Sequence, residues 1–335
     1  MALLVGNMPW SSKRGVRKQL LNRLGVGCKG LLSWRLVKKS LDARHGKQRW
    51  VAVYKVEVDD EATVLEQKPS SVRLWTHRDE ERFGDGSHMA ANRRPIAVSP
   101  IVIGAGPAGL FAALSMAEAG AAVRLFDRGD QVERRVAAVE GFWRGTRSLD
   151  PDSNILFGEG GAGTFSDGKL YTRRRDGEWG YIFRRLVDFG ADTSILTTAH
   201  AHLGTDKLRS ILRAFRERLK ELGTEVCFRA KVVDLILERG SCQGVVLQDG
   251  EMVRGHPVLV AHGHSAPDTC EMLLRARVGA RARPLAVGAR IEHPQRLIDE
   301  GQYKTADRGP LPPATYRLTC RIDRPAFTFC MCPGG

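Results

Sequence analysis

The apolar positions between residues 96 and 127 follow the pattern of a strand, a helix and a second strand. A short apolar run ending at Ile103 predicts a buried strand. The helix expected over residues 107–119 has a proline in its first turn and ends at Gly120. A second apolar run, residues 123–126, ends in Asp127. This order of elements predicts a βαβ unit.

A G-x-G-x-x-G sequence lies between the first strand and the helix. Gly104 permits the tight turn, Gly106 lets a pyrophosphate approach the backbone, and Gly109 lets the helix pack closely on the sheet. The free N–H groups of the helix N-terminus favour phosphate. Asp127 is placed to accept hydrogen bonds from a ribose hydroxyl. The pattern predicts a dinucleotide site; the alternative is a glycine-rich loop in an ordinary βαβ unit.

The first 66 residues have the pattern of a small α+β domain. Val16, Leu20 and Leu24 fall on one face of a helix that ends at Gly25. Residues 34–41 and 50–58 are expected to form a hairpin, because apolar and polar positions alternate in the second segment. Residues 67–95 are charged and rich in Ser, Gly and Pro, and we expect a linker there with one short edge strand at 72–76.

Helices and short strands are also expected after the βαβ unit. Helical spacing is found at residues 131–145, 178–189 and 205–222, the last with Thr205 as its N-cap. Strands are expected at 226–228, 232–237, 245–247 and 258–260, with a turn at 248–250 between the last two, and the pattern alternates again over 317–331. The strand 258–260 leads into Ala261–Ser265, a small glycine loop that favours a second approach to the same nucleotide.

Residues 154–171 form a second glycine-rich stretch. Five glycines lie there among small and hydroxyl residues, so that backbone N–H groups can come close to a ligand. Thr164 and Ser166 add hydroxyl groups, and Lys169 adds a positive charge. A flexible surface loop is the alternative, although the aromatic residues Phe157 and Phe165 are expected to anchor the stretch in a core.

The charge of the chain is concentrated in its first third. The 335 residues carry a formal net charge of +14, and residues 1–100 hold 19 Lys and Arg against 10 Asp and Glu. Such an excess attracts nucleic acid, an acidic partner or a membrane surface, or it is a solvated face. An RNA-reading sheet needs stacking aromatic residues. Trp34, Trp50 and Tyr54 are available, but we expect them in the core of the small domain.

Histidine and cysteine residues give weaker candidates for chemistry. His200 and His202 are spaced to share a metal on a strand, but no further ligand is at an obvious spacing. His264 is a weak candidate for proton transfer. Cys330 and Cys332 form a C-x-C pair. Three interpretations of this pair are possible: a buried strand end, a metal site or a redox pair. Seven scattered cysteines favour a reducing compartment, so we expect a cytoplasmic protein, and we expect no membrane span.

Several motifs together resemble a known family. The segments are GAGPAG, NILFGEGGAGTFSDGKLYT, HLGTDKLR, GHSAPDT, GARIEHPQ and FCMCPGG, with KKSLDAR before them. The chain resembles the uncharacterised FAD-dependent dehydrogenases that carry an N-terminal ferredoxin-like domain. The resemblance implies an α/β fold: a Rossmann-like, glutathione-reductase-like FAD-binding domain over residues 96–335 with an inserted α+β segment, preceded by a small ferredoxin-like α+β domain over residues 1–66.

The resemblance also implies FAD as the tightly held cofactor. Asp127 stands where the family usually has Glu, as a shorter acceptor for the adenosine ribose, and Val232 stands where the backbone faces adenine. Residues 160–166 are expected along the flavin side. The residues implied to bind the cofactor are Gly104, Ala105, Gly106, Pro107, Ala108, Gly109, Asp127, Arg128, Gly160, Gly161, Ala162, Gly163, Thr164, Ser166, Val232 and Gly263.

The leading hypothesis is an FAD-dependent oxidoreductase in which a hydride passes through flavin N5 to or from a small-molecule substrate, with NAD(P)H as a transient donor. His264 and Lys169 are the catalytic candidates. One alternative is an RNA-associated protein that uses its basic residues 1–66. Because the family continues beyond Cys-Pro-Gly-Gly, the other alternative is an inactive flavoprotein truncated at its C-terminus.

Overall fold

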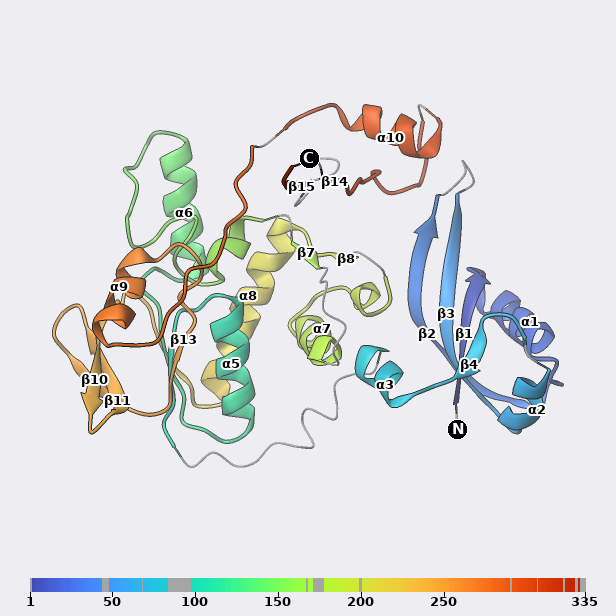
Figure 1. The fold of residues 1–335 in the computed structure, drawn as a ribbon, viewed down its shortest axis with the longest axis horizontal. Helices are drawn as coiled ribbons and strands as arrows, with labels where there is room; N and C mark the ends of the chain where they lie inside the picture. The colour runs from blue at the N-terminus through green and yellow to red at the C-terminus, as the bar shows by residue number, and fades with distance from the viewer. Residues whose placement is uncertain are drawn as a thin grey trace. The chain divides into compact units, whose positions relative to one another are not determined.

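The computed structural model divides the chain into two compact units, each of which is described by itself. It describes residues 2–43, 48–67, 69–83, 98–166, 168–170, 178–198, 201–289, 291–305, 307–321, 323–328 and 331. The first unit consists of residues 1–83, 196–199 and 283–335, and the second consists of residues 84–195 and 200–282 (Figure 1).

The first unit contains a four-stranded antiparallel sheet. Its strands are β1 (Ala2–Pro9), β2 (Leu31–Asp42), β3 (Arg49–Val58) and β4 (Val72–Leu74), in the spatial order β2-β3-β1-β4. Helix α1 (Lys13–Leu24) follows β1, and the short helix α2 (Glu61–Glu66) follows β3. This βαββαβ order is that of the ferredoxin-like arrangement.

The core of the first unit lies between its helices and its sheet. Val16, Leu20 and Leu24 of α1 pack with Leu3 of β1 and Tyr54 of β3 in one buried cluster. The predicted helix is confirmed, and it ends at Gly25, which has a φ of 66°. The predicted hairpin is also confirmed, since β2 pairs with β3.

The first unit is larger than the sequence indicated. Strand β1 was not predicted, because its apolar residues show no strict alternation, and it pairs with both β3 and β4. The segment interpreted as a linker contains the expected edge strand, β4, and then helix α3 (His77–Phe83). A bidentate pair between the exposed Arg73 and the buried Asp79 joins these two elements.

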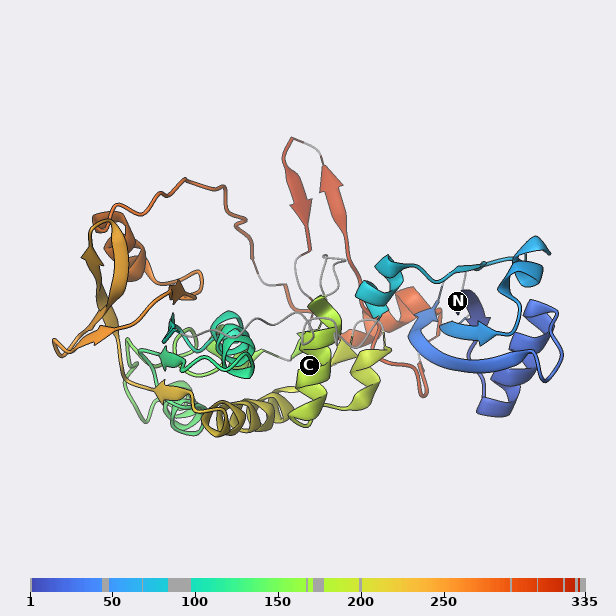
Figure 2. The same cartoon turned by 90° about the horizontal axis from the view of Figure 1, so that it is seen from below.

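Residues 283–335 group with this unit, although a single domain was expected over residues 96–335. They include helix α10 (Gln295–Tyr303) and a hairpin of β14 (Thr319–Arg321) and β15 (Pro325–Phe327), drawn as two red strands in Figure 2. Gln48 Nε2 donates to the carbonyl oxygen of Tyr303 at 2.7 Å. Contacts of this kind between distant parts of the chain cannot be predicted from local patterns.

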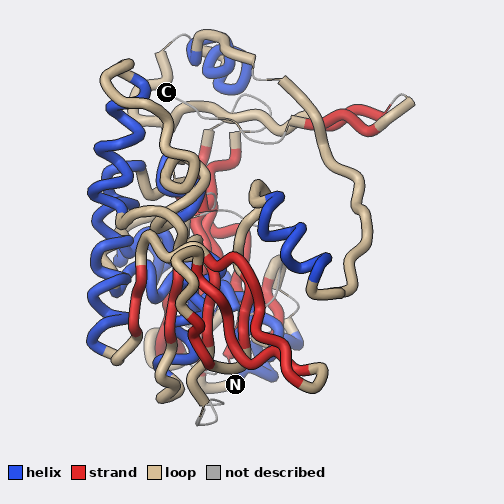
Figure 3. Tube along the Cα trace, turned by 90° about the vertical axis from the view of Figure 1, so that its left-hand side faces the viewer, coloured by secondary structure: helices blue, strands red, loops and turns tan. Residues whose placement is uncertain are grey.

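The second unit is built on a parallel sheet. Its strands are β13 (Val258–Val260), β5 (Ile101–Ile103), β6 (Arg124–Phe126) and β9 (Glu225–Cys227), in that spatial order. Helix α5 (Pro107–Glu118) connects β5 to β6, so the predicted βαβ unit is confirmed. Figure 3 distinguishes the helices from the strands by colour. Helix α8 (Thr205–Glu221) has Gly204 as its N-cap, so the prediction of Thr205 was wrong by one residue.

A second sheet packs beside the parallel one. Strands β10 (Val232–Glu238), β11 (Ser241–Leu247) and β12 (Met252–Arg254) are antiparallel. The turn at residues 248–250 therefore joins β11 to β12, and β13 pairs with β5. The predicted link between β11 and β13 was wrong, because β12 has only three residues and only its middle residue, Val253, is buried. Both sheets contribute to one apolar core together with Met272 of α9 (Pro267–Arg275).

The other described elements of the second unit are short or lie at its surface: α6 (Val132–Trp143), the 3-10 helices η2 (Gly161–Phe165) and η3 (Thr193–Leu196), β7 (Lys169–Leu170), α7 (Glu178–Asp188) and β8 (Ala201–His202). Among the described residues, no helix is both long enough and apolar enough to cross a lipid bilayer.

Candidate functional site

The ends of three parallel strands meet at one edge of the sheet. The carboxyl ends of β5, β6 and β13 lead into Gly104, Asp127 and Ala261 respectively. Gly104 N donates to the carbonyl oxygen of Phe126 at 2.7 Å, and Ala261 N donates to that of Ile103 at 2.8 Å. In open α/β sheets, ligands bind outside the carboxyl ends of the strands. The candidate site is therefore at this edge.

The three glycines of the first loop differ in whether the fold requires them. Gly104 has a φ of 102°, and a Cβ on it would lie 2.5 Å from the carbonyl oxygen of Ala261. A Cβ on Gly109 would overlap the carbonyl oxygen of Gly104. Gly106 has an ordinary φ of −74°, and a Cβ there would have the Cα of Gly161 as its nearest neighbour, at 3.8 Å. Only Gly106 of these three is free to change without strain, so the backbone here leaves room for a ligand.

The second glycine stretch packs directly against the first. Gly160 N donates to the carbonyl oxygen of Ala105 at 2.8 Å, and a Cβ on Gly161 would lie 3.2 Å from the Cα of Gly106. The sequence predicted that both stretches face the same cofactor, and the structure brings them together. We call residues 104–109 and 158–164 the glycine cradle. The two loops meet at Gly106 and Gly161, beside the N-terminus of α5, and neither of these residues has a side chain.

The pattern of Gly158–Gly163 also fits G-x-G-x-x-G, but its surroundings differ from those of residues 104–109. No strand precedes it among the described residues 149–160, and the 3-10 helix η2 follows it. The motif needs a strand before it and a helix after it to act as a dinucleotide fingerprint. The second stretch is therefore a partner of the first and not a second Rossmann motif.

Arg135 holds the second glycine stretch in place, and sequence reasoning missed it. Its side chain extends from α6 and is fully buried. The guanidinium donates to the carbonyl oxygens of Asn154, Ile155, Gly158 and Glu159 at 2.7 to 3.3 Å. Burial lowers the pKa of Arg135 to about 10, so it stays charged at neutral pH. A positive residue on an amphipathic helix is normally exposed, and no sequence signal marks this one as buried.

The hydroxyl of Thr164 is hydrogen-bonded within the protein. Its hydroxyl accepts from Arg135 Nη1 at 2.9 Å, donates to the carbonyl oxygen of Glu159 and is fully buried. The prediction that this hydroxyl faces the cofactor was wrong, because it is enclosed within its own loop. Ser166 is exposed, and its Oγ accepts from Gly168 N at 3.1 Å. Ala162 and Gly163 lie in η2 between these residues.

A buried carboxylate joins the cradle to two helices. Glu159 Oε2 accepts from Val132 N at the start of α6, at 2.7 Å, and from Arg216 of α8, at 2.6 Å. Glu133 also binds Arg216, at 2.8 Å. The other oxygen of Glu159 is buried without a hydrogen-bond partner in the described structure. Burial raises the pKa of Glu159 to about 7, in spite of its bonds to Val132 and Arg216.

Glu159→Gln is expected to remove part of the pH dependence of stability. The folded pKa of about 7 exceeds the ordinary value of 4.5, so the folded chain keeps a proton that the unfolded chain releases between these values. The free energy of unfolding therefore falls as pH rises from 4.5 to 7, by on the order of 3 kcal/mol, and this contribution is constant above 7. Urea unfolding of both proteins at several pH values measures it. Parallel pH profiles would contradict the assignment.

Asp127 organises the first loop from the end of β6. Its Oδ2 accepts from Ala105 N at 2.7 Å, and its Oδ1 accepts from Gly129 N at 2.8 Å. Burial raises the pKa of Asp127 above its ordinary value. Sequence reasoning expected this carboxylate to bind a ribose, and the structure shows that each oxygen already has a backbone donor. Contact with a ribose through the remaining lone pairs stays a prediction.

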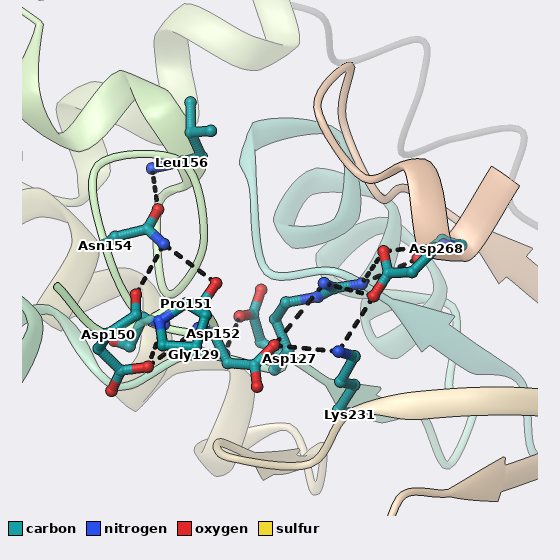
Figure 4. A network of polar contacts seen from close by, with 12 residues as sticks. Asp127, Gly129, Asp150, Pro151, Asp152, Asn154, Leu156, Lys231 and Asp268 are labelled. Carbon is teal, nitrogen blue, oxygen red and sulfur yellow. Dashed lines mark hydrogen bonds and ion pairs between the residues drawn. The ribbon is translucent and has the colours of Figure 1, made fainter.

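An ion-pair network surrounds the end of β6 (Figure 4). Arg128 binds the two oxygens of Asp268 at 2.9 and 3.0 Å and lies over the ring of Phe157, 4.5 Å from its centroid. Lys231 binds Asp268 at 3.0 Å and Asp152 at 3.2 Å. These bonds keep the pKa of Asp268 well below its usual range. The network ties β6 and the loop of residues 150–157 to β10 and α9.

A small cavity lies between this network and the glycine loop. It has a volume of about 40 Å³ and is lined by Ile103, Gly104, Phe126, Asp127, Arg128, Phe157, Ala230, Val232, His262 and Thr269. Val232, Gly104, Asp127 and Arg128 thus line one cavity, and their contacts with the cofactor stay predictions. His262 Nδ1 is buried without a hydrogen-bond partner in the described structure. Gly263, with a φ of 77°, follows it in the exposed part of the loop.

The weaker candidates remain predictions. His264 is exposed, and its Nδ1 lies 3.5 Å from the hydroxyl of Ser265. The side chains of Lys169 and His202, and residues His200, Cys330 and Cys332, lie outside what the structure describes. The described residues contain no group of three or more His, Cys, Asp or Glu that could hold a metal ion.

The parallel sheet and the glycine cradle define a Rossmann-like dinucleotide-binding fold. Residues 99–148 match the family model described as FAD binding domain, and residues 284–335 match the model described as FAD-dependent protein, C-terminal domain-like. The chain thus carries an FAD-binding domain of mixed α and β content. The resemblance seen in the sequence is confirmed at this level.

The chain is also similar to individual proteins. It is 35% identical over 327 residues to an uncharacterized protein of Clostridium beijerinckii (strain ATCC 51743 / NCIMB 8052); this match covers 96% of the chain, which spans only 60% of the relative's length. THI4 of Thermovibrio ammonificans matches 54% of the chain and 64% of its own length, with 16% identity and a TM-score of 0.38. The 3-ketosteroid-delta4-(5alpha)-dehydrogenase of Rhodococcus jostii RHA1 matches 50% and 48%, with 16% identity and a TM-score of 0.32.

Proposed function

We propose that the chain is an FAD-dependent oxidoreductase whose cofactor lies along the glycine cradle. The observation that carries this proposal is the contact between Gly106 and Gly161, two residues without side chains that meet beside the N-terminus of α5. Helix N-termini bind phosphate through their free N–H groups and their positive dipole end. The match of residues 99–148 to an FAD-binding domain supports FAD over other dinucleotides.

Two different parts of the site would hold the pyrophosphate and the adenosine of such a cofactor. The pyrophosphate would lie against the backbone of Gly106 and Gly161, where a Cβ would intrude. The adenosine would lie toward the cavity lined by Asp127, Val232 and His262. The unpartnered Nδ1 of His262 would gain a polar partner there. Entry of the adenosine needs more room than the 40 Å³ cavity gives, so Arg128 and Phe157 must move apart.

FAD supplies hydride and electron transfer when it is bound, and the protein supplies binding, orientation and electrostatics. The chain's own contribution begins with Asp127, which fixes the first loop through Ala105 N. Arg135 fixes the second loop through four carbonyl oxygens. The ion pair of Arg128 with Asp268 covers the adenosine end. We propose NAD(P)H as a transient donor that binds elsewhere than the cradle.

Titration of the purified chain with FAD, FMN and NADH tests the proposal. We expect FAD to bind with a stoichiometry of one and to shift its absorbance bands. FMN lacks the adenosine half and is expected to bind more weakly. Binding of NADH alone, or of none of the three, would contradict the proposal.

A further inference from the structure

Helix α1 carries an exposed group of cations that have no carboxylate partner within the described part of the chain. Lys13, Arg14, Arg17 and Lys18 are all exposed, and we call them the α1 basic face. The pairs Lys13–Arg17 and Arg14–Lys18 are four residues apart, so each pair lies about 6 Å apart along the helix axis. The helix has no acidic residue.

These cations lack carboxylate partners within the described part of the chain. None of the four takes part in an ion pair, and Arg17 instead donates to the carbonyl oxygen of Cys28 at 3.1 Å. Five acidic residues of the same unit are bound elsewhere. Asp42 binds Arg49, Glu57 binds Ser33, Asp60 caps α2 through Thr63, Asp79 binds Arg73, and Glu80 binds Lys55.

The stability of α1 does not account for this arrangement. Positive charges in the first turn of a helix oppose the helix dipole, and like charges four residues apart repel each other. Lys13 and Arg14 are in the first turn, where acidic residues would stabilise the helix. A face that costs the fold free energy and has no carboxylate partner in the described structure points to an external anion.

We infer that the α1 basic face binds the phosphodiester backbone of a nucleic acid. Closely spaced cations without partners match the repeated phosphates of such a chain, which dominate its binding to proteins. The face offers no apolar anchor for a bilayer, since Val16, Leu20 and Leu24 are buried against the sheet. Protein partners are recognised mainly through aromatic and apolar anchors, which this face also lacks.

Two of the three aromatic residues considered for stacking on bases lie in or against the core of this unit. Tyr54 is 2% exposed, and Trp34 packs against the core, as expected from the sequence. Trp50 differs from that expectation, because its ring and that of Trp10 enclose the ammonium of Lys39, at 4.4 Å from each centroid. Binding through α1 is therefore expected to be independent of sequence.

The test is fluorescence anisotropy with the full chain and two labelled probes, a single-stranded RNA of about 20 nucleotides and a DNA duplex of about 20 base pairs, which is about two helical turns. The variant Lys13→Glu/Arg14→Glu/Lys18→Glu removes three cations and keeps Arg17, which bonds to Cys28. The matched control is Arg134→Glu/Arg218→Glu/Lys220→Glu, which changes the net charge equally at exposed positions of the second unit that already have carboxylate partners.

The α1 variant is expected to bind RNA at least tenfold more weakly at about 100 mM salt. The slope of log K against log salt is expected to fall by about 2, since each phosphate contact with a single strand contributes about 0.7. The control is expected to change affinity less than threefold, and the two probes show whether single strands or duplexes are preferred. Equal losses in both variants would overturn the inference. The inference would also be overturned if the chain bound no nucleic acid, or if it bound only vesicles that contain phosphatidylserine.

An unchanged far-UV circular dichroism spectrum shows that the variants fold.

Discussion

Arg135→Met is expected to destabilise the second unit by about 3 to 5 kcal/mol, the cost of removing one member of a buried charged network. The guanidinium donates to four carbonyl oxygens and to the Thr164 hydroxyl while fully buried. Methionine fills a similar volume but donates nothing. Each buried acceptor that loses its donor without gaining water costs about 1 to 3 kcal/mol. Thermal and urea unfolding followed by circular dichroism measure the loss.

The neighbouring residue provides the control for Arg135. Arg134 is 74% exposed and contacts Asp130 only at 3.9 Å. Exposed pairs contribute roughly 0 to 1 kcal/mol, so Arg134→Met is expected to leave the unfolding transition almost unchanged. If both variants unfold at the same urea concentration as the unmodified chain, Arg135 does not hold the second glycine stretch.

Gly106→Val is expected to abolish tight FAD binding while the chain stays folded. The backbone at Gly106 has a φ of −74°, which any residue adopts, and the nearest atom to a Cβ at this position would be 3.8 Å away. The protein therefore has room for a Cβ at this position, and a valine side chain would extend into the place proposed for the pyrophosphate. We expect the dissociation constant for FAD to rise at least tenfold, equivalent to at least about 1.4 kcal/mol. Quenching of FAD fluorescence measures it.

Two other glycines separate loss of the cofactor from loss of the fold. Gly279 is exposed, and a Cβ there would have no atom within 4 Å, so Gly279→Val is expected to bind FAD normally. Gly109→Ala is expected to prevent folding, because its Cβ would overlap the carbonyl oxygen of Gly104. A Gly106→Val chain that binds FAD as tightly as the Gly279→Val chain would place the pyrophosphate elsewhere.

The sequence predicted the elements whose causes are local. The strand ending at Ile103, the glycine turn and helix α5 follow from apolar runs and from backbone conformations that only glycine tolerates. Helix α1 and the β2–β3 hairpin follow from periodicity. These features depend on residues close together in the chain, so their patterns are visible without a structure.

What the sequence did not predict is the hydrogen-bond partner of each polar side chain. The Thr164 hydroxyl was assigned to the cofactor, yet it bonds within its own loop. Both oxygens of Asp127 accept from backbone N–H groups, and its contact with a ribose stays a prediction. The choice depends on distances between segments that are far apart in sequence. Arg135 was missed for the same reason, because its carbonyl partners lie 19 or more residues away. Strand β1 was missed because its two pairing strands come later in the chain.

Equilibrium binding of FAD to the unmodified chain, measured after gel filtration by absorbance and by quenching of FAD fluorescence, tests the glycine cradle most directly. We predict flavin bands that stay with the protein, one FAD per chain, and loss of those bands in Gly106→Val. A folded chain that stays colourless and does not quench FAD at any concentration would contradict the assignment of the glycine cradle as an FAD site.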